Sequence, residues 1–218
     1  AEEAPELTEV LDRVLDDAGF LAGELPGALV KLERETRRFE IDVGDDAHEF
    51  AVRMDDRRRR EQRRIELQER IARDGVAGVH ADLYPFQAEG VAFLAANGRA
   101  LLADDMGLGK TLQSIAASVC LRNDEGVKTT LVVCPASLKY QWAREIRRFT
   151  DLAVEVIQGG GKQRRAQYRR KAPFTVMNYE LVLRDYLALA ELLAPDLLML
   201  DEAQRIKNWR TKTATAVK

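Results

Sequence analysis

The decisive stretch of this sequence is Ala103-Asp104-Asp105-Met106-Gly107-Leu108-Gly109-Lys110-Thr111. It follows a short apolar run at 100–102, which indicates a buried strand, and it precedes 112–121, where the apolar residues fall on one face of a helix. A strand, a glycine-bearing turn that ends in Gly-Lys-Thr and a helix form the arrangement of a phosphate-binding loop. Small residues let backbone N–H groups curl around an anion, and the helix N-terminus adds a partial positive charge.

Residues of this loop have expected roles toward a nucleotide. Lys110 would reach the β- and γ-phosphates, and the hydroxyl of Thr111 would hold Mg²⁺. The strict pattern has a glycine five residues before Gly109, where this chain has Asp104, so the loop alone also fits a glycine-rich turn that binds nothing. The nucleotide contacts expected in this stretch come from Asp104, Met106, Gly107, Leu108, Gly109, Lys110 and Thr111.

Composition limits the classes of function. The 218 residues are 46% hydrophobic and 32% charged, which suffices for a core and for much solvated helix surface. The formal net charge of −2 gives no overall basic character, so any contact with nucleic acid must come from local clusters. No apolar run reaches the length of a membrane span, and the acidic N-terminus does not resemble a signal peptide. We expect a cytoplasmic protein without a membrane partner, associated with the nucleoid if the source is bacterial.

The cysteines and histidines do not indicate a metal site. Cys120 and Cys134 lie in the apolar helix and strand that flank the loop, so we expect both to be small buried hydrophobes in a reduced compartment. His48 and His80 have no Cys or His neighbours at the spacing of metal ligands, and no zinc site is expected.

The first 80 residues are expected to form a small α+β N-terminal extension. Its predicted elements are a helix at 8–21, a hairpin with alternating arms at 39–43 and 50–54, a basic helix at 55–74 and a glycine-containing linker at 75–78. The arginines at 57–60, 63 and 64 suit contact with DNA phosphates or with another lobe. A solvated helix face, neutralised by the acids beside them, explains these arginines at least as well.

Residues 81–218 alternate short apolar strands with helices. The predicted strands lie at 100–102, 130–134, 153–157, 174–177 and 197–200, and the predicted helices at 87–96, 112–121, 137–149, 163–170 and 181–193. This alternation predicts an α/β fold with a mainly parallel sheet flanked by helices. Ligands of such sheets bind at the carboxyl ends of the strands, where the loop falls.

Two acids follow the last predicted strand. Asp201 lies where the second carboxylate of a nucleotide site belongs and would hold Mg²⁺, directly or through water. Glu202 would orient and deprotonate the attacking water. Adjacent acids at a strand end also occur by chance as a helix cap, but the Gly-Lys-Thr loop upstream favours a nucleoside triphosphatase.

Several runs in this part of the chain resemble one family. The run at 200–208, LDEAQRIKN, resembles the second helicase motif of the superfamily-two helicases and, more narrowly, that of the SWI/SNF family of DNA-translocating ATPases. The loop DDMGLGKT is similar to the DEMGLGKT of that family, with Asp105 where Glu is usual, and the family has no glycine at the place of Asp104. The segments 83–91, 134–142 and 178–180 resemble, in the correct order, the adenine-contacting segment and two further motifs.

The resemblance implies a RecA-like first lobe that binds ATP and Mg²⁺ and acts on double-stranded DNA. Gln87 would read the adenine edge, and the catalytic residues would be Lys110, Asp201 and Glu202, with Thr111 and Asp201 at the metal. Gln204 stands where related helicases have histidine, and its amide can still bridge the two sites. The motif that contains Ser137 and Lys139 touches the DNA backbone in the family. With these two, the residues expected at DNA are Asn178 and, from the basic cluster at 162–171, Arg164 and Arg165.

The sequence also sets the expected scope of the activity. The chain ends at Lys218, before the third motif and the second lobe of the family, so we expect a truncated first lobe at 81–218 with weak ATP hydrolysis on its own. The first hypothesis is the ATP-binding lobe of an ATP-dependent DNA translocase or remodelling enzyme. The alternatives are a nucleotide- and DNA-binding or interaction fragment without turnover, and a strand-separating helicase. The remodelled substrate and any protein partner of residues 1–80 stay open.

Overall fold

The computed structural model describes residues 27, 30, 34, 45–105, 107–208 and 210–217. Contacts divide the chain into two compact units, Ala1–Arg63 and Arg64–Lys218, which are described separately. The helix predicted at 8–21 and the first hairpin arm at 39–43 lie outside the described residues. In the described part, no helix combines the length and the apolar character that crossing a bilayer requires.

Helix α3 (Asp45–Asp74) occupies the place of the second predicted hairpin arm. The strand predicted at 50–54 is therefore wrong, whereas the helix predicted at 55–74 is confirmed. The alternation of Phe50, Val52 and Met54 is set among residues of good helix propensity. Ion pairs one helical turn apart, such as that between Arg59 and Asp55 at 2.6 Å, add to this preference.

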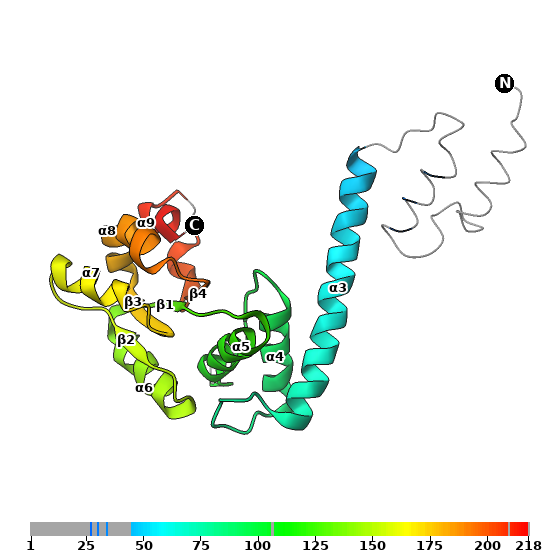
Figure 1. Cartoon of the computed structure of the whole chain (residues 1–218), viewed down its shortest axis with the longest axis horizontal. Helices are drawn as coiled ribbons and strands as arrows, with labels where there is room; N and C mark the ends of the chain where they lie inside the picture. Colours follow the sequence, from blue (N-terminus) through cyan, green and yellow to red (C-terminus); the bar gives the residue numbers. More distant parts are fainter. Residues whose placement is uncertain are drawn as a thin grey trace, which may run out of the picture. The chain divides into compact units, whose positions relative to one another are not determined.

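The C-terminal part of α3 packs into the second unit. Leu67 and Ile71 are buried in one cluster with helices α4 (Pro85–Ala96) and α5 (Lys110–Glu125), which lie side by side (Figure 1). The contacts thus divide the chain within α3. The sequence places the domain boundary later, after the linker at 75–78.

A four-stranded parallel sheet forms the centre of the second unit. Its strands are β1 (Thr130–Cys134), β2 (Val154–Val156), β3 (Phe174–Asn178) and β4 (Leu197–Leu200), in the order β2-β3-β1-β4. Cys134 is in register with Asn178, and Val133 with Leu200. The predicted mainly parallel α/β fold is confirmed for this unit.

Helices cover both faces of this sheet. Successive residues of a strand point to opposite faces, so Val132 and Cys134 join a cluster with Ile115 of α5 and Trp142, whereas Leu131 joins the cluster on the other face. The remaining elements of the unit are η2 (Ala136–Leu138), α6 (Lys139–Phe149), α7 (Gly161–Arg169), α8 (Tyr179–Ala188), the π-helical turn η3 (Leu189–Leu193), η4 (Ala203–Ile206) and α9 (Lys212–Val217).

The strand predicted at 100–102 is wrong. These residues form no sheet pairing, and the side chain of Leu101 is 72% exposed. Three apolar residues offer few ladder hydrogen bonds, and a polar turn at 97–99 precedes them. Leu102 is instead partly buried and approaches Gly90 of α4. The loop that follows is therefore held by α4 and α5.

Candidate active site

The glycine-bearing loop has a backbone that only glycine adopts easily. Gly107 and Gly109 have φ angles of +88° and +77°, in the left-handed region. A Cβ at Gly109 would lie 2.6 Å from Nε2 of Gln87, so this position also lacks room for a side chain. Gly109 directly precedes α5, where the free N–H groups of the first helical turn favour an anion.

The ammonium of Lys110 lies against the loop. It donates to the carbonyl oxygens of Asp104 and Asp105 at 2.9 and 2.8 Å. Phosphate oxygens are charged acceptors and form stronger bonds with an ammonium than carbonyls do. Thr111 is partly buried in the first turn of α5, and Met106 lies outside the described residues. The loop therefore presents a lysine and a helix N-terminus at one place.

Gln87 meets the loop from the start of α4. Its side chain is 6% exposed, and its Nε2 donates to the carbonyl of Leu108 at 3.2 Å. Its Oε1 accepts from the backbone N–H of Tyr84 at 3.1 Å and so satisfies a backbone donor at the start of the helix. The structure therefore brings the segment at 83–91 into contact with the loop.

Sequence reasoning missed a second amide at the loop. The side chain of Gln113 is fully buried, and its Nε2 donates to the carbonyl of Leu108 at 3.2 Å and to the carboxylate of Asp104 at 3.3 Å. The available signal was a polar residue on the buried face of an apolar helix. It lies one helical turn after Gly109, which aims its side chain back at the loop.

Asp201 is fixed by bonds at three of its atoms. Its backbone N–H donates to the carbonyl of Val133 at 2.9 Å, and its own carbonyl accepts from the hydroxyl of Tyr179 at 2.7 Å. The indole Nε1–H of Trp142 donates to its carboxylate at 2.8 Å. The next residue, Glu202, has a φ angle of +55°, an uncommon and strained conformation for a residue with a Cβ.

The carboxylate of Asp201 also affects its buried neighbours. Burial, together with this negative charge, raises the pKa of the Cys134 thiol to about 12 and that of the Tyr179 hydroxyl to about 12. Both groups are therefore neutral at pH 7, and Cys134 is a buried free thiol without nucleophilic character. The prediction that both cysteines are buried hydrophobes is confirmed.

Further predicted residues meet at the carboxyl edge of the sheet. Ser137 is exposed in η2 after β1, and Asn178 ends the neighbouring β3. Lys139 is partly buried and donates to the carbonyl of Ile157 at 3.0 Å. Asp201 follows β4, on the other side of β1, so the parallel order brings the ends of these strands to one edge.

Two predicted motifs contact each other beside this edge. The guanidinium of Arg205 lies 5.5 Å from the ring of Tyr179 and 3.1 Å from the carboxylate of Glu180. The segments 178–180 and 200–208 are thus joined. Among the described residues, no hydrogen bond or ion pair joins Asp201 or Glu202 to the loop.

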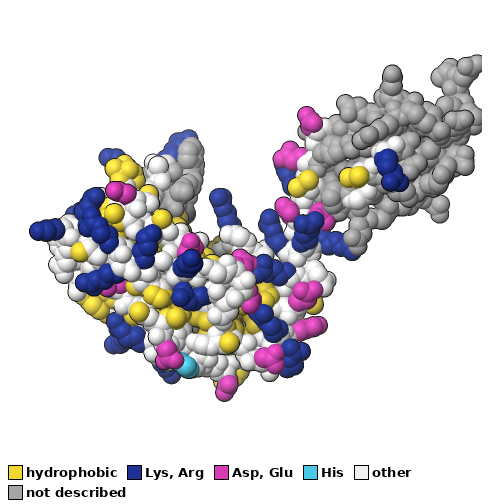
Figure 2. Space-filling model, viewed as in Figure 1, with side chains coloured by type: hydrophobic (Ala, Val, Ile, Leu, Met, Phe, Trp, Pro, Cys, Tyr) yellow, Lys and Arg dark blue, Asp and Glu magenta, His cyan; other side chains and the backbone are white. Residues whose placement is uncertain are grey.

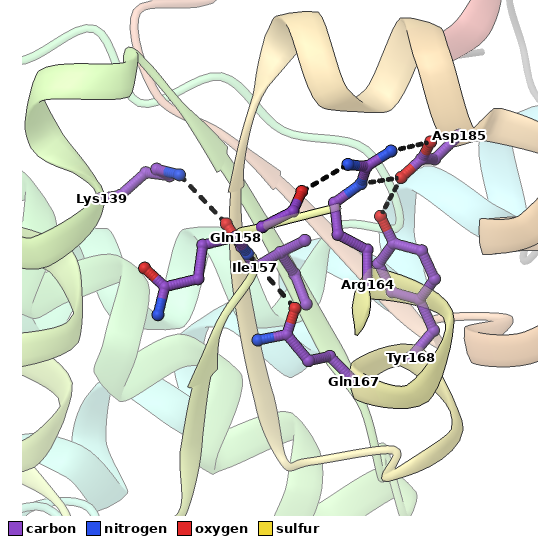
Figure 3. A network of polar contacts seen from close by, with 8 residues as sticks. Lys139, Ile157, Gln158, Arg164, Gln167, Tyr168 and Asp185 are labelled. Atoms are coloured by element: carbon purple, nitrogen blue, oxygen red, sulfur yellow. Dashed lines mark hydrogen bonds and ion pairs between the residues drawn. The ribbon is translucent and has the colours of Figure 1, made fainter. Parts of the chain in front are cut away.

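The structure corrects the interpretation of Arg164. Arg164 is buried, and its guanidinium forms bonds of 2.5 and 2.8 Å to the carboxylate of Asp185 (Figure 3). The buried hydroxyl of Tyr168 donates to the same carboxylate at 2.7 Å. Arg164 is therefore an internal residue and is not a surface contact for DNA phosphate.

The basic cluster at 162–171 is also less basic than its sequence indicates. Arg165 is exposed and lies 3.7 Å from Glu191, and Arg170 pairs with Glu155 at 2.9 Å. These acids come from distant segments, so the sequence of the cluster does not reveal them. Figure 2 shows acidic side chains between the Lys and Arg side chains of the described surface.

Replacement of Trp142 by phenylalanine should destabilise the second unit. Trp142 is a core residue, 6% exposed, and the substitution removes the donor to the Asp201 carboxylate. The loss of a hydrogen bond to a charged group should lower the free energy of unfolding by about 1.5–3 kcal/mol, measured in urea. Tyr140→Phe is the control, because the bond from Tyr140 to Gln158 is exposed. Equal unfolding midpoints for Trp142→Phe and wild type would show that the indole bond contributes nothing.

Comparison with known proteins assigns this site to a family. The model of the SNF2-related domain matches residues 86–218, more than half of the chain. The DNA excision repair protein ERCC-6-like of Danio rerio is 36% identical over 151 residues, which cover 63% of this chain and 10% of that protein. The ISWI chromatin-remodeling complex ATPase ISW1 of Saccharomyces cerevisiae is 34% identical over 147 residues, which cover 62% of this chain and 13% of that protein.

A solved structure agrees with this assignment. The Sulfolobus solfataricus SWI2/SNF2 ATPase core in complex with dsDNA superimposes with a TM-score of 0.55 and 31% identity, over 65% of this chain and 30% of that chain. The chain therefore spans about a tenth of the length of these curated relatives and a third of this ATPase core. The matched region contains the glycine-bearing loop, the four strands and the pair Asp201-Glu202. This chain belongs to the SNF2-related domain family.

Proposed function

We propose that this chain is the ATP-binding lobe of an ATP-dependent double-stranded DNA translocase. The observation that carries the proposal is the loop: a lysine and a helix N-terminus lie beside Gln87 in a member of the SNF2-related domain family. Nucleotide binding follows from that family. Lys110 binds the β- and γ-phosphates, and Gln87 reads the adenine edge.

The chemical step would use the carboxylates beyond β4. Thr111 and Asp201 are the proposed Mg²⁺ ligands, since hydroxyl and carboxylate oxygens suit this cation. Mg²⁺ would neutralise charge on the transferred phosphoryl group. Glu202 would orient and deprotonate the attacking water. The hydrogen bond from Trp142 to Asp201 supports the role of Asp201 as a Mg²⁺ ligand, because it fixes one oxygen of the Asp201 carboxylate in place.

The proposed DNA surface is the carboxyl edge of the sheet. Ser137 and Asn178 have side chains suited to phosphate contacts, and Lys139 adds a positive charge two residues after Ser137. Arg165, which is exposed in α7, is proposed as a further phosphate contact. The support is the resemblance to a solved ATPase core that is in complex with dsDNA. Residues 1–80 are proposed to bind a protein partner.

The test of the proposed function is ATP hydrolysis, with and without duplex DNA, by residues 1–218 and by a version extended through a second lobe. We expect slow turnover by the chain alone and fast, DNA-stimulated turnover by the extended protein. An arginine from a second lobe can raise phosphoryl-transfer rates by about 10³–10⁵. Fast DNA-stimulated turnover by residues 1–218 alone would contradict the need for a second lobe, and no turnover by either would contradict the translocase.

One observation favours a second candidate, a nucleotide-binding module without turnover. The loop and the pair Asp201-Glu202 share no hydrogen bond or ion pair in the described part of the chain. Such a module would bind ATP through Lys110 and leave Asp201 and Glu202 without a catalytic role. ATP binding by the extended protein with no hydrolysis, with or without DNA, would establish this alternative.

A further inference from the structure

The carbonyl of Leu108 accepts hydrogen bonds from two buried amides. Nε2 of Gln87 in α4 and Nε2 of Gln113 in α5 both lie 3.2 Å from this oxygen. A carbonyl oxygen has two lone pairs, so both bonds can exist together. Since a single donor already satisfies a carbonyl oxygen, the second donor is in excess in this structure.

The two amides differ in how easily each can give up its hydrogen bond to the Leu108 carbonyl. Gln87 lies in the first turn of α4, and its other bond is to the backbone of Tyr84, three residues before it. If the Gln87 amide turns toward a purine, it loses the hydrogen bond from its Nε2 to the Leu108 carbonyl. Gln113 has no such freedom, because its Nε2 is shared between Leu108 and the carboxylate of Asp104.

The oxygen of the Gln113 amide has a different environment from its nitrogen. Its Oε1 is buried and has no hydrogen-bond partner among the described residues. The amide keeps this orientation because both acceptors lie on its Nε2 side. Gly90 leaves the necessary room, since a Cβ there would lie 1.8 Å from Oε1. An unsatisfied buried acceptor is rare and needs a reason.

We infer that Gln113 is a positioning residue that holds the Leu108 carbonyl while Gln87 turns to read adenine. The phosphate-binding loop thereby keeps its conformation when Gln87 binds the base. Without Gln113, release of Gln87 would leave the Leu108 carbonyl without a side-chain donor, and the loss of this bond would fall on adenine nucleotides alone. The inference rests on the proposed function, because it takes adenine as the base that Gln87 reads.

The test compares the dissociation constants of ATP and GTP for the full-length protein. Gln113→Met keeps an unbranched side chain of similar size and removes the donor. The substitution should weaken ATP binding about tenfold, the value of one hydrogen bond, and GTP binding less than twofold. Ser118→Ala is the matched control, because it removes a buried bond to Thr130 from the same helix, far from the loop. It should leave the ratio of the two constants unchanged.

A second pair of variants removes the ambiguity of misfolding. Gly90→Ala should displace the Gln113 amide, while alanine improves the helix propensity of α4. We expect the same selective loss of ATP binding, and the unfolding temperature of each variant shows whether it is folded at the temperature of the titration. Gly98→Ala is the control, because nothing lies within 4 Å of a Cβ there.

The outcomes separate this inference from the proposed function. Equal weakening of ATP and GTP in Gln113→Met and Gly90→Ala, with normal selective ATP binding by the wild type, would overturn the role of Gln113 alone. Unchanged constants for both nucleotides would overturn it in the same way. A wild type that binds neither nucleotide, or both equally, would refute nucleotide binding or adenine reading first, and this inference with it.

Discussion

Replacement of Lys110 by alanine is expected to weaken ATP binding by the full-length protein about a hundredfold. The ammonium lies at the loop, 2.9 and 2.8 Å from two of its carbonyls, at the N-terminus of α5. Its move to phosphate oxygens exchanges neutral acceptors for charged ones. Two charge-assisted bonds of about 1.5 kcal/mol each correspond to a factor of about 100 in the dissociation constant. Titration calorimetry with a non-hydrolysable ATP analogue measures this factor.

Lys128→Ala is the control for this prediction. Lys128 is exposed, and it lies between α5 and β1, away from the loop. Alanine is the best helix former, so Lys110→Ala should leave the start of α5 folded. Unchanged ATP affinity in Lys110→Ala would show that the loop does not bind phosphate. Equal weakening by both lysine variants would point to a general effect of charge on binding.

The sequence predicted those elements whose residues satisfy one pattern throughout. The run at 130–134 is apolar or β-branched in every position, and β1 has these same bounds. The same holds for β4 at 197–200. β1 lies inside the sheet and β4 at one edge, next to β1, and strands of a parallel α/β sheet covered by helices read as continuous apolar runs. The apolar face predicted for α5 is confirmed in the burial of Ile115, Val119 and Cys120.

Three failures share a physical cause: the deciding partner is distant in the sequence. The run at 100–102 is as apolar as a strand, but no strand pairs with it among the described residues. The basic cluster has no acid within it, whereas Asp185, which pairs with Arg164, follows in α8. Gln113 has a polar side chain on a buried face, and only the position of the loop explains it. Tertiary contacts override local patterns in each case.

Replacement of Arg164 by alanine is expected to lower the free energy of unfolding by about 3–5 kcal/mol, because it leaves the charge of Asp185 buried without its partner. The two side chains are 6% and 12% exposed, and the guanidinium also donates to the carbonyl of Gly159 at 2.7 Å. Urea unfolding measures the loss. Arg165→Ala is the matched control, since this neighbour is half exposed and its ion pair should contribute at most about 1 kcal/mol. Equal losses in the two variants would contradict a special role for the buried pair.

The same ion pair predicts a dependence of stability on pH. The guanidinium of Arg164 is the main cause that lowers the pKa of Asp185, with a further bond from Tyr168, while burial opposes both. A carboxyl group with a lowered pKa in the folded state stabilises it fully above the unfolded pKa of about 3.9. This contribution is lost as the pH falls from that value through the folded pKa. Asp185→Asn keeps the shape and lacks the charge, so its deficit against wild type should be constant near neutral pH and shrink below about pH 4. Unfolding free energies measured between pH 3 and 7 test this, and a deficit that stays constant to pH 3 would mean that the carboxylate is not stabilised by its partner.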